Sequence, residues 1–465
     1  MENNWRAALH NLGCKVNAYE TEKMQRMLEE SGFAVVPFTE AADVYVINTC
    51  SVTAVADKKS RQMIHRARRR NPGAVVIAAG CYVQREDVTP ESLDCDLIIG
   101  NDEKHRLAEL VAGMLDHKRK ILEKELSQNS GLPEEQEAFW DQEARRQIHR
   151  HDINSQDEAY EELYDSAADG GQGQQSERTR AFVKIQDGCN QFCTYCIIPY
   201  VRGRTRSRSA DNVIAEIQML VGQGYKEVVL TGIHLSSYAD GDAGLIDLCE
   251  RIDRQTGLKR LRISSLEPRI VTEDFVRRLS ALPSICPHFH LSLQSGSDTV
   301  IARMNRKYTT EEFAAGVGLL RQYFDNPAIT TDVIAGFPGE SEEEFVRGKA
   351  FLEEMRFYEM HVFPYSRRDG TPAAKMKGQL PNRVRQERAG ELIALAGQMS
   401  EAYRASWKGR QAEVLFEEYE ERGGQRIWSG FSREYVRVFV QSEDDLRNQI
   451  VNVVYDENAG KGAIQ

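Results

Sequence analysis

The chain has 465 residues, of which 41% are hydrophobic and 28% charged, and its formal net charge is −11. This length predicts about three domains with hydrophobic cores. The longest apolar runs fall far short of the ~18 residues of a membrane helix, and the first residues lack the basic and apolar regions of a signal peptide. We therefore expect a cytoplasmic protein, monomeric and without a membrane partner.

The acidity is concentrated in one segment. Residues 117–178 contain 15 acidic and 8 basic residues, show little apolar periodicity and end in a Gly- and Gln-rich stretch. This composition predicts a flexible acidic linker. The chain also has nine cysteines. An odd number of cysteines in a cytosolic protein favours metal sites over a disulfide framework.

Residues 1–116 alternate between apolar runs and helical periodicity, which predicts an open parallel α/β domain. A helix predicted to begin with Asp57 as its cap ends before Asn71 and Pro72. The predicted strands are Ala7–Leu12, Val44–Ile47, Ala74–Ala79 and Leu97–Gly100, and the predicted helices are Glu20–Ser31 and Asp57–Arg70.

Three cysteines directly follow predicted strands of this domain: Cys14, Cys50 and Cys81. The carboxyl ends of parallel strands share one edge of a sheet, so these thiols can converge into a three-thiolate site. Three buried packing cysteines are an equally good interpretation of position alone. The other isolated cysteines lack such a context and are predicted to be packing residues: Cys95, Cys249 and Cys286.

A second cysteine trio is local. Cys189, Cys193 and Cys196 have C-x3-C-x2-C spacing. Iron–sulfur cubanes normally take four thiolates, so three leave one iron open for a chelating small molecule. A zinc knuckle or redox pair is the alternative, but zinc sites usually close with a second Cys pair or with histidines, and no second pair follows. The spacing is the signature of the radical S-adenosylmethionine superfamily, which this sequence resembles.

Residues 179–408 contain six strand–helix repeats, which predict an incomplete (β/α)6 barrel. The local cysteine trio follows the first strand, at the carboxyl-terminal face where barrel active sites lie. The predicted strands are Ala181–Gln186, Glu227–Thr231, Lys259–Ser264, His288–Leu293, Ile329–Ala335 and Glu359–Phe363, and predicted helices include Ser209–Val221, Glu340–Met355 and Pro381–Tyr403.

Polar residues and a glycine lie at or near the ends of the later strands and are candidates to bind S-adenosylmethionine. Gly232 would let the backbone approach a ligand, and a simple turn is the alternative. Polar groups inside the barrel need partners, so a structural network explains the others about as well. The candidates are Thr231, Gly232, Ser265, Glu267, Gln294 and Asp332.

Residues 409–465 contain short alternating strands and predict a small all-β module. Its predicted strands are Ala412–Glu417, Glu434–Val440 and Gln449–Val454. One face of the second strand (Glu434, Val436, Val438, Val440) is predicted to be core. The other (Arg433, Tyr435, Arg437, Phe439) is either a basic and aromatic RNA-binding face or an ordinary solvated one.

Basic residues also cluster near both cysteine trios and could contact RNA phosphates, although a basic solvated surface is the plainer interpretation. One cluster lies on the predicted helix that follows Cys50, and the other follows Cys196. Their members are Lys58, Lys59, Arg61, Arg66, Arg68, Arg69 and Arg70, and Arg202, Arg204, Arg206 and Arg208.

These motifs together resemble the tRNA methylthiotransferases, a radical S-adenosylmethionine family, over nearly the whole chain. The matching segments are Leu12–Asn17, Asn48–Thr53 and Ala79–Tyr82 around the separated cysteines, and Gly188–Arg204 and Leu293–Ser297 in the barrel. The resemblance implies that Cys14, Cys50 and Cys81 hold an auxiliary cluster. It also implies that the β module is an RNA-binding TRAM domain, an OB-like barrel.

Two segments resemble the branch that modifies threonylcarbamoyladenosine next to the anticodon in tRNAs reading ANN codons: Gly-Cys-Lys-Val-Asn at 13–17 and Cys-Ile-Ile-Pro-Tyr-Val-Arg-Gly-Arg at 196–204. Branches acting on isopentenyladenosine or on a ribosomal-protein aspartate are the alternatives. A non-catalytic, zinc-containing RNA-binding protein is the alternative from another class. The long linker and Ala239–Asp240 depart from the family pattern.

The implied reaction replaces an aromatic C–H by C–S–CH3, which no general base can achieve at neutral pH, so cofactors must supply radical chemistry. The resemblance implies two [4Fe-4S] clusters and S-adenosylmethionine, acting as both methyl donor and radical source. The implied partners are a tRNA anticodon stem-loop, a one-electron reductant such as flavodoxin or ferredoxin, and a sulfur source.

Overall fold

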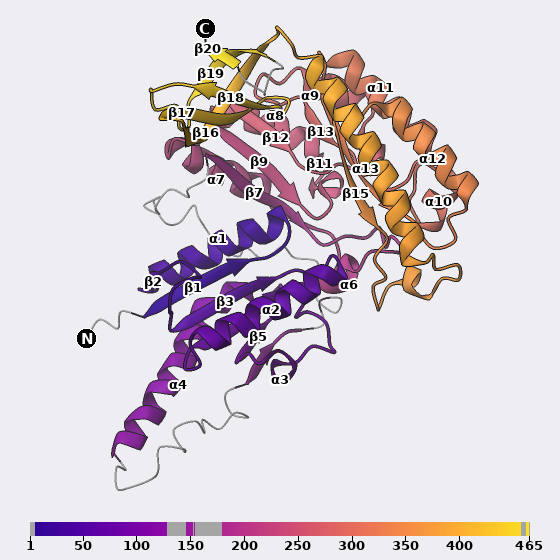
Figure 1. Ribbon diagram of the computed structural model, residues 1–465. Coiled ribbons are helices and arrows are strands. Elements are labelled where there is room, and N and C mark those ends of the chain that lie inside the picture. The colour runs from indigo at the N-terminus through magenta and orange to yellow at the C-terminus, as the bar shows by residue number, and fades with distance from the viewer. Residues whose placement is uncertain (1–4, 128–145, 152, 154–178, 457–461, 465) are drawn as a thin grey trace. The chain divides into compact units, whose positions relative to one another are not determined.

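The computed structural model describes residues 5–127, 146–151, 153, 179–456 and 462–464 (Figure 1). These residues form two compact units. The first contains the N-terminal part together with 188–190 and 196–204, and the second contains 179–187, 191–195 and the residues from 205 onward. Within the described ranges, no helix has the length and apolar character needed to cross a membrane.

The N-terminal unit is built on a six-stranded sheet in the order β2-β1-β3-β4-β5-β6, in which every pairing is parallel. All residues of β3 and β4 are buried, as expected for strands covered on both faces. The predicted parallel sheet is thus confirmed. The strands are β1 (Arg6–Asn11), β2 (Ala34–Val35), β3 (Val44–Thr49), β4 (Val75–Gly80), β5 (Leu97–Ile99) and β6 (Gln147–His149).

Helices cover both faces of this sheet, giving three layers. Met24 and Val111, from α1 and α4, pack in the core on one face, while Ile64 and Ala67 of α2 pack in the core on the other. The helical segments are α1 (Lys15–Glu30), α2 (Ala54–Arg70), α3 (Pro90–Leu93), η1 (Lys104–Arg106) and α4 (Leu107–Ser127).

The structure differs from the sequence-based expectation at two places in this unit. Thr53 caps α2 by accepting a hydrogen bond from the Ala56 amide, so Asp57 is not the cap; it lies in the first turn and accepts a bond from Ser51. Within the expected linker of residues 117–178, α4 continues to Ser127 and β6 pairs with β5. Most of that segment lies outside the described residues.

The second unit contains the barrel strands, which follow one another in space in chain order. Sheets β12-β9-β7-β8 and β13-β14-β15 are joined by parallel bridges from Leu261 to Ile285 and from Leu266 to Leu291. Six parallel strands therefore form the predicted incomplete barrel. They are β7 (Arg180–Asp187), β9 (Glu227–Gly232), β12 (Arg260–Ile263), β13 (His288–His290), β14 (Ala328–Ala335) and β15 (Glu359–Pro364). The short β8 (Arg206–Ser207) pairs antiparallel with β7, and β10 (Ala239–Asp240) and β11 (Ala243–Gly244) form a small hairpin.

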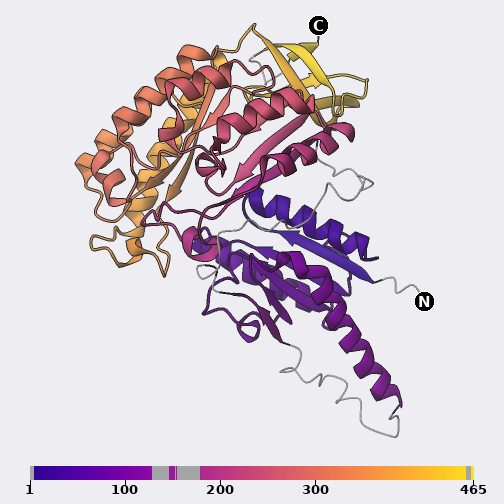
Figure 2. The same cartoon turned by 180° about the vertical axis from the view of Figure 1, so that it is seen from behind.

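Helices line the outside of the barrel, as Figure 2 shows from behind. Local signals set their starts: Ser209 caps α7, and capping boxes pair Thr309 with Glu312 in α11 and Ser341 with Glu344 in α12. The helices are α7 (Ala210–Gly222), α8 (Leu245–Thr256), α9 (Glu273–Ser280), α10 (Asp298–Arg303), α11 (Thr310–Tyr323), α12 (Glu342–Met355) and α13 (Asn382–Ala405).

The C-terminal module is an antiparallel sheet in the order β18-β17-β16-β19-β20, and its edge strands β18 and β20 lie near each other. Trp428, Phe416 and Val438 lie in its core, which Tyr358 and Trp407 complete from outside the sheet. The strands are β16 (Gln411–Arg422), β17 (Gln425–Ser432), β18 (Arg437–Gln441), β19 (Ile450–Tyr455) and β20 (Gly462–Ile464).

A buried ion triad joins this module to the barrel. Glu227 at the start of β9 pairs with Arg260 and Arg262 of β12, each through Nε at 2.8 Å, and all three side chains are at most 2% exposed. Arg260 also donates to the Ser432 carbonyl at 2.7 Å, and Arg262 to the Arg433 carbonyl at 2.9 Å. Both arginines therefore bind backbone carbonyls of the C-terminal module and, at the same time, a carboxylate of the barrel.

The predicted basic and aromatic face of the module is only partly free. Val436, Val438 and Val440 are buried, as predicted. However, Arg433 donates to the carbonyls of Pro283 and Ile285 in the barrel, and Tyr435 stacks on Phe431 and His288. These two residues thus dock the module to the barrel, a role that neither interpretation of this face, RNA-binding or solvated, had included. Arg437 is exposed and lies over the Phe439 ring.

Replacing Glu227 with Gln should lower the free energy of unfolding by about 3–5 kcal/mol at pH 7, because it leaves two buried guanidinium groups without their carboxylate. The measurement is urea unfolding. Burial raises the pKa of Glu227, but Arg262 and Arg260 outweigh that and lower it to about 2. In the wild-type protein, the stability that the Glu227 carboxylate contributes should therefore be lost as the pH falls from about 4.5 towards 2.

The control is Glu420→Gln, which removes an exposed pair with Arg422 and should change stability by less than about 1 kcal/mol. The free energy of unfolding of Glu227→Gln should also fall less steeply than that of the wild type as the pH is lowered, because the variant has no carboxylate to protonate at this position. Equal stabilities of the Glu227 and Glu420 variants would contradict this account of the triad.

Candidate metal centres

The three separated cysteines lie at the ends of three adjacent strands of the N-terminal sheet. Cys14 follows β1 and precedes α1, Cys50 directly follows β3, and Cys81 directly follows β4. The amide of Cys81 donates to the Thr49 carbonyl at 3.2 Å, which continues the β3–β4 ladder up to the cysteines. The strand register therefore brings these three residues to one edge of the sheet.

The first loop passes directly over Cys50. Gly13 has φ +109°, and a Cβ at this position would lie 2.8 Å from both the Cβ and Sγ of Cys50. Only glycine fits this close approach. The Asn17 amide holds the same crossing by donating to the carbonyls of Leu12 at 2.7 Å and Thr49 at 2.9 Å. The Gly-Cys-x-x-Asn pattern thus has a direct structural reason.

The thiols share one electrostatic neighbourhood. The pKa of Cys50 is raised to about 11, mainly by burial and also by the neighbouring Cys81 and Cys14, whereas a backbone hydrogen bond from Val52 and the charge of Arg202 act to lower it. Neutral thiols in such a place are poor nucleophiles, whereas metal binding requires and stabilises thiolates. The three isolated cysteines that were predicted to be packing residues are all buried: Cys95, Cys249 and Cys286.

The local trio begins at the end of β7. Gly188 has φ +69°, and a Cβ there would lie 1.8 Å from the Arg204 carbonyl oxygen, so this position also requires glycine. The Cys189 amide donates to the Gly203 carbonyl at 3.0 Å. Thus the segment before Cys189 and the segment after Cys196 are bound together by backbone contacts.

The middle cysteine is held by the barrel. The Thr194 amide donates to the Met304 carbonyl at 3.0 Å, and the Thr194 carbonyl accepts from the Ala373 amide at 2.8 Å. Arg306 donates to the sulfur of Cys193 at 3.4 Å and to the Ser292 carbonyl at 3.0 Å. Arg306 therefore links the sulfur of Cys193 to the barrel backbone.

The other candidate residues occupy different environments. Thr231 and Glu267 are buried and Ser265 is exposed. Glu267 accepts a bond from the Arg269 amide, and burial raises its pKa. Gly232 lies against β7, where an added Cβ would be 3.0 Å from the Gln186 carbonyl, so strand packing alone already explains this glycine.

Gln294 and Asp332 lie on neighbouring segments. Gln294 has φ +71°, donates from its amide to the Asp332 carbonyl at 2.9 Å, and bridges to Val333. This places both residues beside the β13–β14 pairing, but their backbone contacts do not assign them a ligand.

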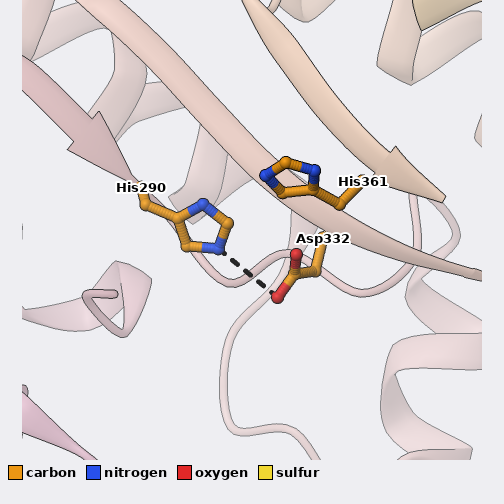
Figure 3. Close-up of side chains that lie close together, drawn as sticks. All are labelled: His290, Asp332 and His361. Atoms are coloured by element: carbon orange, nitrogen blue, oxygen red, sulfur yellow. Dashed lines mark ion pairs between the residues drawn. The ribbon is translucent and has the colours of Figure 1, made fainter. Parts of the chain in front are cut away.

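Two histidines that the sequence did not single out lie near Asp332 (Figure 3). His290 Nε2 lies 3.4 Å from Asp332 Oδ2, and the rings of His290 and His361 stack with centroids 6.0 Å apart. One ligand atom of each of the three residues lies within 4.8 Å of the others. The β14–β15 register pairs Asp332 with His361, so the group is formed by strand alignment, which sequence spacing does not reveal.

A histidine after β9 was also missed. His234 receives no motif signal, but its Nε2 lies 3.5 Å from the Gln191 amide nitrogen, next to the local trio. Burial lowers the pKa of His234 to about 4, and the charge of Arg306 acts in the same direction. The ring is therefore neutral at pH 7 and can accept or donate a hydrogen bond there.

The two basic clusters differ in accessibility. On α2, Arg61 is exposed but donates to the Tyr82 hydroxyl at 2.8 Å, and Arg68 pairs with Asp96 at 2.7 Å. After Cys196, Arg202 and Arg208 are buried in ion pairs with Glu20 and Glu216. The prediction that Arg202 and Arg208 contact RNA phosphates is therefore wrong. The α2 residues that can still meet a ligand at the surface are Lys58, Lys59, Arg66 and Arg69.

Comparison with known proteins identifies the family of this chain. The Radical SAM superfamily matches residues 183–351, and the Uncharacterized protein family UPF0004 matches residues 6–100. The threonylcarbamoyladenosine tRNA methylthiotransferase MtaB of Bacillus subtilis is 40% identical over 451 residues, covering 96% of this chain and 92% of that protein. This chain belongs to the radical S-adenosylmethionine tRNA methylthiotransferase family.

Other relatives place the chain within the family. The MtaB of Aquifex aeolicus is 36% identical over 88% of this chain and 92% of that protein. The tRNA-2-methylthio-N(6)-dimethylallyladenosine synthase of Acetivibrio thermocellus is 30% identical over 96% of this chain and 87% of that protein. The family predicted from the cysteine motifs is confirmed, and a non-catalytic zinc protein is disfavoured.

A solved structure shows a similar fold at low sequence identity. The radical S-adenosylmethionine methyltransferase TsrM from Kitasatospora setae, with cobalamin and a [4Fe-4S] cluster bound, has a TM-score of 0.56 and 16% identity. The match covers 80% of this chain and 77% of that chain. It supports the predicted fold class.

Proposed function

We propose that this protein inserts a methylthio group at carbon 2 of threonylcarbamoyladenosine next to the anticodon of tRNAs reading ANN codons. The observation that carries the proposal is the sequence identity of 34–40%, over 87–96% of this chain, to relatives named for that reaction. Similarity to the dimethylallyladenosine synthases is lower, at 30–33%. Isopentenyladenosine is therefore the second candidate substrate.

Each cysteine trio is assigned one [4Fe-4S] cluster. Cys14, Cys50 and Cys81 hold the auxiliary cluster, and a second cluster is held by Cys189, Cys193 and Cys196. The donor sets fit, because iron–sulfur clusters take Cys thiolates and the sulfur of Cys81 accepts a bond from a guanidinium. When bound, the clusters and S-adenosylmethionine supply the electron transfer, the radical chemistry and the methylthio group.

The protein's own residues position these groups. Arg306 holds the sulfur of Cys193 and the Ser292 carbonyl, which fixes the middle cysteine of the local trio. Contacts to S-adenosylmethionine are proposed for Thr231, Gly232, Ser265, Glu267, Gln294 and Asp332. His290, paired with Asp332, and neutral His234 add polar atoms for ligand contact.

The proposed tRNA contacts are the exposed basic residues of α2 and the Arg437 and Phe439 pair of the C-terminal module, which we assign as a TRAM-like RNA-binding domain. A guanidinium and an aromatic ring suit phosphate and base contact. The reaction also requires a one-electron reductant of the flavodoxin or ferredoxin class and a sulfur source.

Deletion of the gene should remove 2-methylthio-threonylcarbamoyladenosine from total tRNA and leave threonylcarbamoyladenosine in its place. The measurement is nucleoside mass spectrometry, with complementation by the wild-type gene as the control. A deletion strain that keeps this nucleoside, or that loses 2-methylthio-isopentenyladenosine instead, would overturn the substrate assignment.

Cysteine variants should separate the two clusters. Cys193→Ala should abolish cleavage of S-adenosylmethionine to 5′-deoxyadenosine, whereas Cys50→Ala should keep this cleavage but form no methylthio product. Iron should fall from about eight to about four per chain in each variant, as expected when one of two cubanes is absent. Both are measured after anaerobic reconstitution.

The matched control is Cys249→Ala, a buried cysteine of α8 outside both trios, which should keep about eight irons and full turnover. Product formation by Cys50→Ala would show that the auxiliary cluster has been assigned to the wrong residues.

Charge reversal on α2 should weaken tRNA binding. The double variant Lys58→Glu/Arg66→Glu should raise the Kd for tRNA and reduce the salt dependence of log Kd by roughly 0.7–0.9 for each phosphate that the helix no longer neutralises. Filter binding at several salt concentrations measures both quantities. The control is Arg119→Glu/Lys120→Glu on α4, which makes the same charge change beside Asp116. Equal Kd values for the two double variants would exclude α2 from the interface.

A further inference from the structure

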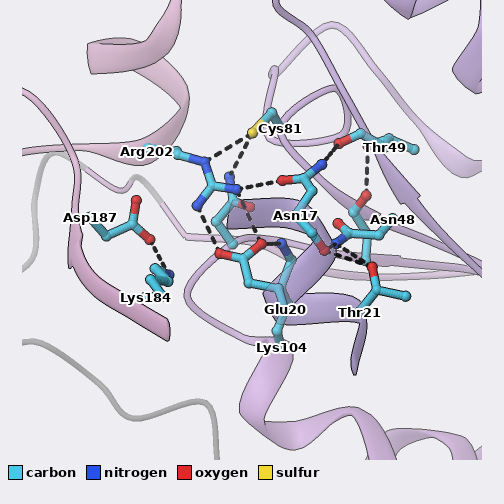
Figure 4. Close-up of polar contacts among 12 residues, drawn as sticks. Asn17, Glu20, Thr21, Asn48, Thr49, Cys81, Lys104, Lys184, Asp187 and Arg202 are labelled. Atoms are coloured by element: carbon cyan, nitrogen blue, oxygen red, sulfur yellow. Dashed lines mark hydrogen bonds and ion pairs between the residues drawn. The ribbon is translucent and has the colours of Figure 1, made fainter. Parts of the chain in front are cut away.

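A buried group of charged residues surrounds one auxiliary cysteine in the N-terminal unit (Figure 4). Arg202, the last residue of α6 (Ile198–Arg202), is 0% exposed, and Lys104 and Glu20 are each 1% exposed. Charged side chains are almost never this buried unless they are paired. The proposed reaction assigns no role to these three charged residues.

All three nitrogens of the Arg202 guanidinium donate hydrogen bonds. Nη1 and Nη2 donate to the two carboxylate oxygens of Glu20 at 2.8 and 3.1 Å, and Nη2 also donates to Asn17 Oδ1 at 2.7 Å. The remaining nitrogen, Nε, donates to Cys81 Sγ at 3.1 Å. The bidentate pair with Glu20 therefore directs the third N–H at the sulfur.

The helix that carries Arg202 is fixed at the same place. Ile197 and Val201 pack with Cys81, and the Val201 carbonyl accepts from Asn101 Nδ2 at 2.7 Å. Asn101 Nδ2 also lies 3.9 Å from the Cys81 sulfur. The Arg202 contact is thus part of a packed and hydrogen-bonded arrangement around one sulfur atom.

Two cations contact the same carboxylate beside this sulfur. Lys104 Nζ donates to the Glu20 carboxylate at 2.5 Å, and Arg202 donates to its two oxygens. A buried ion pair adds little stability compared with well-packed apolar residues, so stability alone is a weak reason to bury these groups. A thiolate bound to iron is a strong acceptor for the Arg202 N–H, whereas a neutral thiol is only a weak one.

We propose that Arg202 is a positioning residue for the auxiliary cluster: it orients the Cys81 sulfur and raises the cluster's reduction potential, with Lys104 acting in the same direction and Glu20 in the opposite one. The inference rests on the proposed auxiliary cluster. Reduction adds negative charge to a cluster, and nearby cations and N–H donors to its sulfur ligands stabilise the reduced form.

The test measures the auxiliary cluster alone. The full-length chain carrying Cys193→Ala and Cys196→Ala is reconstituted anaerobically and titrated with dithionite while the cluster signal is followed by electron paramagnetic resonance. About four irons per chain, removed by the further substitution Cys50→Ala, establish that the remaining cluster is the auxiliary one. A chain without this iron would refute the proposed cluster assignment and, with it, the inference.

In that background, Arg202→Gln should shift the midpoint potential to a more negative value, and Arg202→Lys should shift it less. Lys104→Met should also shift it to a more negative value, whereas Glu20→Gln should shift it to a more positive one. Arg119→Gln, on the surface of α4, should match the parent. If Arg202→Gln fails to retain iron, the opposite shifts of the Lys104 and Glu20 variants decide the question.

An unchanged potential in Arg202→Gln would overturn the inference while leaving the cluster assignment intact. Shifts of the same sign in the Lys104 and Glu20 variants would also overturn it, because a structural disturbance, unlike a charge effect, does not follow the sign of the charge removed.

Discussion

The parallel register of β1, β3 and β4 is the constraint on which the auxiliary site depends. Residues far apart in the chain, Cys14, Cys50 and Cys81, come to one edge because each lies just beyond the carboxyl end of a strand of one sheet. The loops can lie this close only because Gly13 has no Cβ to strike Cys50. Backbone conformation and strand order therefore bring these cysteines together, whereas the local trio is close in the sequence itself.

The second unit uses buried charge for a different purpose. Glu227 and its two arginines connect barrel strands to a turn of the C-terminal module, and Arg433 and Tyr435 extend this docking surface. Near Cys81, by contrast, the buried charges end on a sulfur atom. Similar ion-pair chemistry thus serves domain attachment in one unit and, by our proposal, cofactor tuning in the other.

The sequence predicted the fold class well because it depends on short-range patterns, whereas the cluster at the local trio stays a prediction. The six barrel strands are apolar runs of ordinary length, and the C-x3-C-x2-C spacing is contiguous. Position alone left the convergence of Cys14, Cys50 and Cys81 undecided, because it depends on strand order. Only the resemblance to a family implied that these three cysteines share a cluster.

The errors have a common physical origin. Arg202 and Arg208 resemble surface cations in the sequence, because composition does not show that Glu20 and Glu216 lie opposite them in the fold. Likewise, the alternation of polar and apolar residues from position 433 onward is typical of a strand, but β18 begins only at Arg437. The two histidines near Asp332 lie far from it in the chain, and only the register of β13, β14 and β15 unites the three residues.

The docking of the C-terminal module has a mechanical consequence. Because Arg433 and Tyr435 clamp it to the barrel, Arg437 and Phe439 keep a constant offset from the barrel strands. If these two side chains contact tRNA as proposed, the docking holds that contact at a fixed distance from the barrel strands.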